Sequence, residues 1–113
     1  MNQKVLKQYN VEFYKRAGQK FLNSEVNWLS TFIYIYRDSE TVDEFIADLE
    51  LAITDNVGQI ADPDWSGSMG SYWHAYITPS GMEIWQDMSD RTVIPLQDMK
   101  EILISWREFL EKS

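Results

Sequence analysis

The sequence predicts an α+β fold, with helices packed mainly on one face of an antiparallel sheet of about four strands. Three observations predict it: an amphipathic helical pattern in the middle of the chain, two alternating aromatic-rich runs joined by turn residues, and a second amphipathic pattern near the end. The 113 residues are expected to form a single domain (1–113), and a hydrophobic fraction of 44% is enough to build a core.

The first quarter of the chain predicts a helix and then a strand. Apolar side chains recur at roughly helical spacing over residues 10–22, behind Asn10 as the candidate N-cap. Gly18 lies inside this stretch, and a strand over residues 11–15 is the competing interpretation. Residues 31–36 are β-branched or aromatic at every position, which favours a strand covered on both faces.

The middle of the chain predicts a helix followed by a long loop. Thr41 and Glu44 have the spacing of a capping box, and Asn56 and Gly58 are typical helix terminators. Between them, one helical face carries Val42, Phe45, Ile46, Leu49 and Ile53. Residues 56–71 show no periodicity, and a loop of this length in a small domain is often functional.

The last third predicts a hairpin, a third strand and a terminal helix. Residues 72–78 and 82–86 flank turn residues at 79–81, which is a β-hairpin pattern. A second turn at 87–90 leads into a strand at 92–94, and Pro95 ends that strand and opens a helix. The apolar stripe of this helix contains Met99, Ile102, Leu103, Trp106, Phe109 and Leu110.

Charge and cysteine content exclude several classes of function. Eighteen Asp and Glu against ten Lys and Arg give a net charge of −8, which argues against binding phosphate backbones and favours basic partners. Absence of Cys excludes disulfides and thiolate metal sites and fits a cytoplasmic protein. The longest apolar cluster, residues 32–36, is too short to span a bilayer, and no signal peptide is visible.

Catalytic and metal-binding chemistry finds little support in the sequence. Residues 62–67 match the start of a calcium loop, but Trp73 occupies the twelfth position, where a bidentate Glu is needed. His74 is the single histidine and cannot build a multi-histidine metal site. No sequence context selects a nucleophile for it, so a structural or interface role is expected. We therefore expect no cofactor, no metal and no enzymatic activity.

An aromatic and acidic set around the predicted hairpin is the strongest candidate for function. Alternation places Tyr72 and Tyr76 on one face of the first strand, and Glu83, Trp85 and Asp87 on one face of the second. These rings either fill a small core or form an interface hot spot for a basic partner. On the second interpretation the partner-binding residues are Asp62, Asp64, Trp65, Tyr72, Tyr76, Glu83, Trp85, Asp87 and Asp90.

The C-terminal half resembles a known group of proteins. The residues that carry the resemblance are 67–73, 77–85, 94–96, 98–103 and 106–110. In these stretches the chain is similar to small acidic immunity proteins of bacterial polymorphic toxin systems, including contact-dependent inhibition and LXG-type toxins. The resemblance implies a non-enzymatic cytoplasmic protein that binds and blocks one cognate toxin.

The leading expectation is thus an inhibitor of a cognate, basic toxin of the nuclease type, with no nucleic-acid or membrane partner. Toxins that act on nucleic acids are often basic, so an acidic inhibitor gains association rate. The alternative is a small-ligand-binding or regulatory domain with a pocket between sheet and helices. An enzyme ranks third, because no nucleophile–base pair or metal set is apparent.

Overall fold

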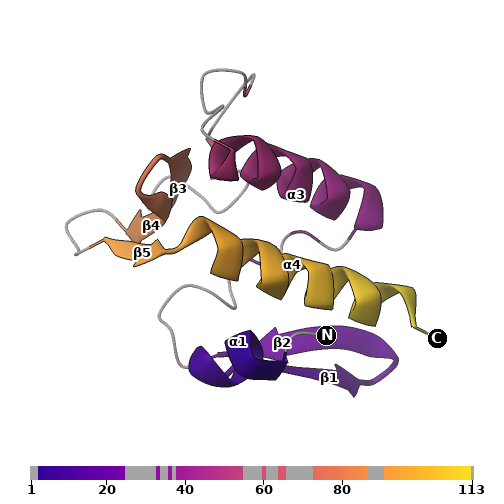
Figure 1. Cartoon of the computed structure of the whole chain (residues 1–113). Helices are drawn as coiled ribbons and strands as arrows, with labels where there is room; N and C mark the ends of the chain where they lie inside the picture. Colours follow the sequence, from indigo (N-terminus) through magenta and orange to yellow (C-terminus); the bar gives the residue numbers. More distant parts are fainter. Residues whose placement is uncertain are drawn as a thin grey trace.

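The computed structural model describes residues 3–24, 33, 36, 38–54, 60, 64–65, 73–86 and 91–112, without the side chains of residues 73 and 86. The regular elements within these residues are helices separated by runs of two or three consecutive strands (Figure 1). In order, they are α1 (Gln3–Gln8), β1 (Glu12–Arg16), β2 (Gln19–Asn23), α3 (Ser39–Ile53), β3 (Trp73–Thr78), β4 (Gly81–Gln86), β5 (Thr92–Ile94) and α4 (Leu96–Glu111).

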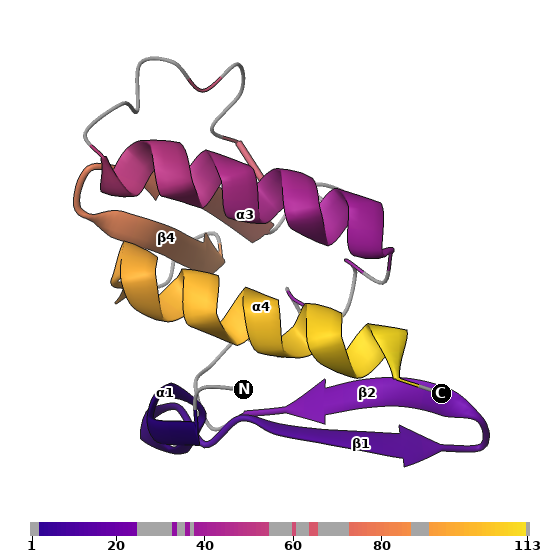
Figure 2. The same ribbon diagram turned by 45° about the vertical axis from the view of Figure 1, so that its right-hand side comes forward.

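The predicted α+β class is confirmed, and the described strands divide between two sheets. Strands β3, β4 and β5 form a three-stranded antiparallel sheet in that order, while β1 and β2 form a separate antiparallel pair. The sequence predicted one sheet of about four strands. Three of the strands expected for that sheet form β3, β4 and β5, whereas β1 and β2 form a pair that packs on α4, away from the larger sheet (Figures 1 and 2).

The helix predicted over residues 10–22 is wrong, because Asn10 ends a helix instead of starting one. Asn10 has a φ of 51°, in the left-handed region. Its backbone N–H donates to the carbonyl of Lys7 at 3.1 Å, and the N–H of Val11 donates to the carbonyl of Leu6 at 2.8 Å. These two bonds form a Schellman motif, which closes α1 and turns the chain into β1.

The competing interpretation, a strand in this region, is confirmed by β1. Ala17 and Gly18 both have positive φ, 53° and 79°, which is the signature of a two-residue type I′ hairpin turn. The turn sets the register from Arg16 opposite Gln19 to Glu12 opposite Asn23. Gly18, which would weaken a helix, is therefore one of the two turn residues of this hairpin.

The strand predicted at residues 31–36 is wrong at Ile33, which is helical. Of this segment the structure describes only Ile33 and Tyr36, and both are buried. The N–H of Tyr36 donates to the carbonyl of Ile33 at 2.9 Å, a turn-like bond between residues three apart. Ile33 and Tyr36 therefore contribute to the core without the extended backbone expected at Ile33.

The middle helix is confirmed as α3, with an earlier cap than predicted. Asp38 is the N-cap, and its carboxylate accepts hydrogen bonds from the Glu40 N–H and the Thr41 hydroxyl. Thr41 therefore lies inside the helix and does not cap it. The terminators predicted at Asn56 and Gly58 lie outside the described residues. Val42, Phe45, Ile46, Leu49 and Ala52 form the buried stripe, and Ile53 is exposed.

The C-terminal elements agree with the sequence. Strands β3 and β4 pair from Trp73 opposite Gln86 to Thr78 opposite Gly81, and β5 follows as predicted. The second turn, at residues 87–90, lies outside the described part of the chain. Helix α4 begins directly after Pro95. The predicted stripe is buried at Met99, Ile102, Leu103 and Trp106 and partly buried at Phe109 and Leu110.

Helices α3 and α4 lie side by side and antiparallel on one face of the larger sheet (Figure 2). Two ion pairs show the antiparallel direction. Asp43, early in α3, pairs with Arg107, late in α4, and Glu50, late in α3, pairs with Lys100, early in α4. The sheet face beneath them is apolar and buried. It is made by Ala75, Ile77, Met82, Ile84 and Ile94.

The N-terminal elements pack on another side of α4 (Figures 1 and 2). The ring of Phe13 in β1 lies 5.7 Å from the Trp106 indole and 5.4 Å from the Phe109 ring. The Tyr9 hydroxyl donates to the Asp98 carboxylate at 2.6 Å, and burial together with this carboxylate raises the Tyr9 pKa. Helix α4 is therefore the element between the two sheets. No helix in the described part of the chain has the length and hydropathy to cross a bilayer.

We expect Trp106→Ala to lower the free energy of unfolding by about 3–5 kcal/mol, the usual cost of truncating a buried Trp or Phe. Trp106 is fully buried, and its loss would open a cavity between α4 and the hairpin. Urea unfolding at equilibrium measures the effect. Trp85→Ala is the matched control, because Trp85 is only half-buried, and it should cost well under half as much.

Gly81→Ala should also destabilise the fold, because the position has both an unusual φ and no room. Its φ is +146°, and an added Cβ would lie 2.7 Å from the carbonyl oxygen of Ile94. We expect a loss of more than about 2 kcal/mol by thermal or urea unfolding. Gly18→Ala is the control, since its φ is +79° but nothing lies within 4 Å of the added Cβ. Equal losses in the two variants would show that the close approach to β5 costs nothing.

Candidate functional site

The face of the larger sheet that points away from α3 and α4 carries polar and aromatic side chains. Directly opposed residues share a face, and the register places Tyr76 opposite Glu83 and Glu83 opposite Val93. Asp64 extends this row through an isolated antiparallel bridge to Tyr76. We call this surface the aromatic face, and it contains Asp64, His74, Tyr76, Glu83, Trp85, Arg91 and Val93.

Three rings of the aromatic face form one stack. The indole of Trp85 lies 5.0 Å from the imidazole of His74, its cross-strand partner, and the interplanar angle is 25°. The ring of Tyr76 lies 5.4 Å from the same indole at 28°. All three side chains are half-buried, so the stack is supported from below and accessible from above. Such stacked rings are held in fixed rotamers by their neighbours.

A cation lies over this stack and is paired with a carboxylate. The guanidinium carbon of Arg91 is 4.1 Å from the centre of the Trp85 ring. Its Nη1 donates to Oε1 of Glu83 at 2.8 Å. This bond, with a smaller contribution from the Thr78 hydroxyl, lowers the pKa of Glu83 below its ordinary value. Glu83 and Arg91 thus balance each other's charge at the centre of the face.

The tight turn between β3 and β4 positions these side chains. The Thr78 hydroxyl donates to the Gly81 carbonyl at 3.1 Å and accepts from the Ser80 N–H at 3.2 Å. The turn fixes the register, and with it the face on which each side chain of the hairpin lies. The face is therefore carried by a paired strand framework with a packed apolar layer beneath it.

The structure brings together four of the nine predicted partner-binding residues. Asp64, Tyr76, Glu83 and Trp85 share the aromatic face. Trp65 does not join them. The other four, Asp62, Tyr72, Asp87 and Asp90, lie outside the described residues. Tyr76 and Trp85 are half-buried on the face opposite the core, so these two rings are not part of the buried core.

Trp65 packs against α3 on the opposite side of the sheet. Its ring stacks on Phe45 at 4.3 Å and 12°, and its indole N–H donates to the Asp48 carboxylate at 3.1 Å. Its backbone N–H donates to the carbonyl of Ala75 at 2.7 Å, and its carbonyl accepts from the Tyr36 hydroxyl. Burial, and then the Asp64 charge, raise the Tyr36 pKa. Trp65 thus attaches its segment to both α3 and β3.

Three residues of the face were absent from the predicted set. His74 has the same strand parity as Tyr76, so alternation alone would have included it. Val93 is 48% exposed and lies opposite Glu83, which follows once β5 is paired with β4. Arg91 precedes β5, and no periodic pattern in the sequence indicates that its side chain returns over Trp85.

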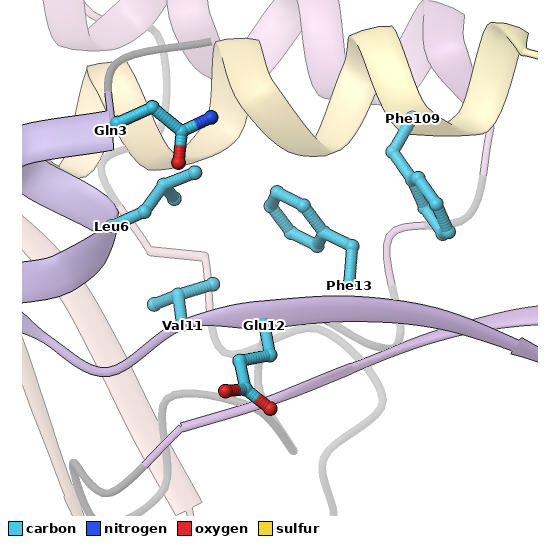
Figure 3. A pocket seen from close by; sticks show the side chains of 6 residues that line it. All are labelled: Gln3, Leu6, Val11, Glu12, Phe13 and Phe109. Carbon is cyan, nitrogen blue, oxygen red and sulfur yellow. The ribbon is translucent and has the colours of Figure 1, made fainter.

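A second surface feature is a hollow of about 460 Å³ between α1, β1 and α4 (Figure 3). Its walls are mostly apolar, and the Phe13 and Phe109 rings lie in it 5.4 Å apart. The sequence suggested a pocket between sheet and helices, and this hollow lies between β1 of the smaller sheet and helices α1 and α4. The lining residues are Gln3, Leu6, Val11, Glu12, Phe13 and Phe109.

The described residues contain no group of three or more His, Asp or Glu side chains placed to hold a metal ion. Of the segment that resembles a calcium loop, residues 62–67, only Asp64 and Trp65 are described. The backbone of Asp64 pairs with β3, and Trp65 is packed on α3. The expectation that this segment binds no calcium stays a prediction.

Comparison with known family models, curated proteins and solved structures finds no match for this chain. The resemblance to immunity proteins therefore stays a prediction. The chemistry of the aromatic face and of the hollow is what supports a function.

Proposed function

We propose that this chain is a non-enzymatic binding protein that recognises a basic protein partner through its aromatic face. The single observation that carries the proposal is the stack of His74, Trp85 and Tyr76 on the sheet face opposite the core. In the form the sequence resemblance suggests, the partner is a cognate bacterial toxin and this protein is its cytoplasmic immunity protein.

The stack has the properties of an interface anchor. Tyr and Trp are enriched among residues that dominate binding energy, because they bury large areas with few rotatable bonds. Here the rings are ordered by their mutual contacts before any partner arrives, so little side-chain entropy is lost on binding. Val93, 48% exposed beside the stack, adds apolar area next to the polar groups.

Charge supports a basic partner mainly at long range. Glu83 is balanced by Arg91, so it adds little net charge to the face. The net charge of −8 nevertheless sets up a field that draws a basic protein toward the surface. Asp62, Asp87 and Asp90, predicted from the sequence to flank the rings, remain part of the proposed contact set. Toxins that act on nucleic acids carry basic surfaces of the required sign.

A second candidate function, binding a small apolar molecule, is favoured by the hollow beside the hairpin. Its volume of about 460 Å³ is in the range of ligand sites, and aliphatic and aromatic side chains line most of it. The Gln3 amide is the polar group at the hollow, whereas the Glu12 carboxylate points away on the other side of β1 (Figure 3). The matching ligand therefore has an apolar body and one group that can hydrogen-bond to an amide.

We expect Trp85→Ala to speed dissociation from the partner by about 30-fold, which corresponds to roughly 2 kcal/mol for a hot-spot residue. The partner is captured from cells carrying the neighbouring genes, and rates are measured by surface plasmon resonance. Asp64→Lys should mainly slow association, and added salt should slow the wild type. Tyr14→Ala is the matched control, because Tyr14 is an exposed ring, 44% accessible, on β1. Equal dissociation rates for Trp85→Ala and Tyr14→Ala would contradict the proposal.

The ligand hypothesis has its own test, a search for a retained small molecule by non-denaturing mass spectrometry of the purified protein. Gln3→Trp should fill the hollow and abolish the retained mass, because residue 3 lines it. Gln8→Trp lies on the same helix outside the lining set and should leave binding unchanged. Absence of any retained or titratable ligand in the wild type would remove this second function.

A further inference from the structure

We propose that Glu83 and Trp85 form an arginine-recognition site, which Arg91 occupies within the chain and from which an arginine side chain of the partner displaces it. The inference rests on the proposed function and names the chemical group of the partner, a guanidinium, that the aromatic face binds. It starts from the position of Arg91, whose guanidinium contacts both an aromatic ring and a carboxylate of β4.

The two contacts match the two chemical properties of a guanidinium. Its planar π system stacks on an aromatic ring, here at 4.1 Å from the Trp85 centre. Its N–H groups donate to a carboxylate, here with Nη1 at 2.8 Å from Oε1 of Glu83. An ammonium group has the charge but not the flat donor fork, so this pair of groups selects arginine over lysine.

The receptor half of this contact is fixed, whereas Arg91 is exposed. The Glu83 side chain is 15% accessible and the Arg91 side chain is 57% accessible. Trp85 is held in place by His74 and Tyr76, which both stack on it. Exposed ion pairs contribute little stability, so exchange of one guanidinium for another requires only a small rearrangement.

Exchange also avoids the main cost of binding at a charged site. A partner that displaced Arg91 without supplying a cation of its own would leave the Glu83 carboxylate unpaired and desolvated. A partner arginine that takes the place of Arg91 keeps this carboxylate paired throughout. Arg91 consequently acts as an internal competitor, and the apparent affinity for arginine falls in proportion to the fraction of molecules whose site it occupies.

The test is an NMR titration of the ¹⁵N-labelled full chain with the peptide acetyl-Gly-Arg-Gly-amide. We expect Arg91→Ala to bind this peptide about tenfold more tightly than the wild type, with the shift centred on the Trp85 indole N–H, because the competitor is removed. Peptides with lysine or citrulline in place of the arginine should bind Arg91→Ala no more tightly than they bind the wild type. Glu83→Gln, added to Arg91→Ala, should abolish the gain.

Two controls keep the result interpretable. Arg107→Ala removes another ion-paired arginine, which pairs with Asp43 and Glu111. Arg107 lies on α4, far from Trp85 in the sequence, so this variant should leave the peptide affinity unchanged. Arg91→Gln repeats the removal with a longer polar side chain, should Arg91→Ala perturb the fold. An affinity no tighter than wild type in both Arg91 variants, or an undiminished gain with Glu83→Gln, would overturn the proposal.

The outcome separates this inference from the proposed function. If partner binding depends on Trp85 but neither Arg91 variant gains affinity for the arginine peptide, the aromatic face binds the partner and arginine recognition is wrong. If the peptide binds more tightly to the Arg91 variants while partner binding is indifferent to Trp85, the arginine site stands and the proposed function is wrong.

Discussion

The indole of Trp106 is the point at which three separate parts of the chain meet. Its Nε1–H donates to the backbone carbonyl of Tyr36 at 2.7 Å, in the segment before α3. Its ring packs at 5.7 Å from Phe13 in the N-terminal hairpin, and it lies on the helix that follows β5. A buried indole that is both packed and hydrogen-bonded accepts few alternative positions. The relative placement of the β1–β2 hairpin, the segment before α3 and the three-stranded sheet therefore depends on the side chain of Trp106.

This arrangement is what leaves the aromatic face available. Both long helices pack on the apolar side of the three-stranded sheet, and the hairpin of β1 and β2 packs on α4 (Figure 2). The rings of the opposite face are then supported by a layer that includes Ala75 and Ile84, both fully buried. Rigid support from below and open access from above are the conditions for a preorganised binding surface. The proposed arginine exchange uses the same rigidity, since only Arg91 has to move.

The sequence was informative where local chemistry decides the structure and misleading where distant contacts decide it. The stripe around Leu103 and the turn after Thr78 are local patterns, so α4 and the β3–β4 hairpin could be predicted. Asn occurs both at the start of helices and, with a positive φ, at their ends, and Ala17 gives no sign of its positive φ. The sequence alone therefore could not decide between a helix over residues 10–22 and the competing strand. In the site, alternation correctly placed Glu83 and Trp85 on one face of β4. The position of Trp65 depends on Phe45 and Asp48, which no spacing along the chain reveals.

The contact between the hairpin and the end of α4 has a consequence for biosynthesis. The ammonium of Lys20 donates to the carbonyl of Leu110 at 2.7 Å, across a separation of 90 residues. Phe13 and Leu22 thus leave the ribosome long before the helix that covers them exists. Contacts of such long range slow the search for the native state, and the uncovered hairpin is open to wrong pairing meanwhile. The N-terminal hairpin can therefore complete its packing only after α4 has emerged.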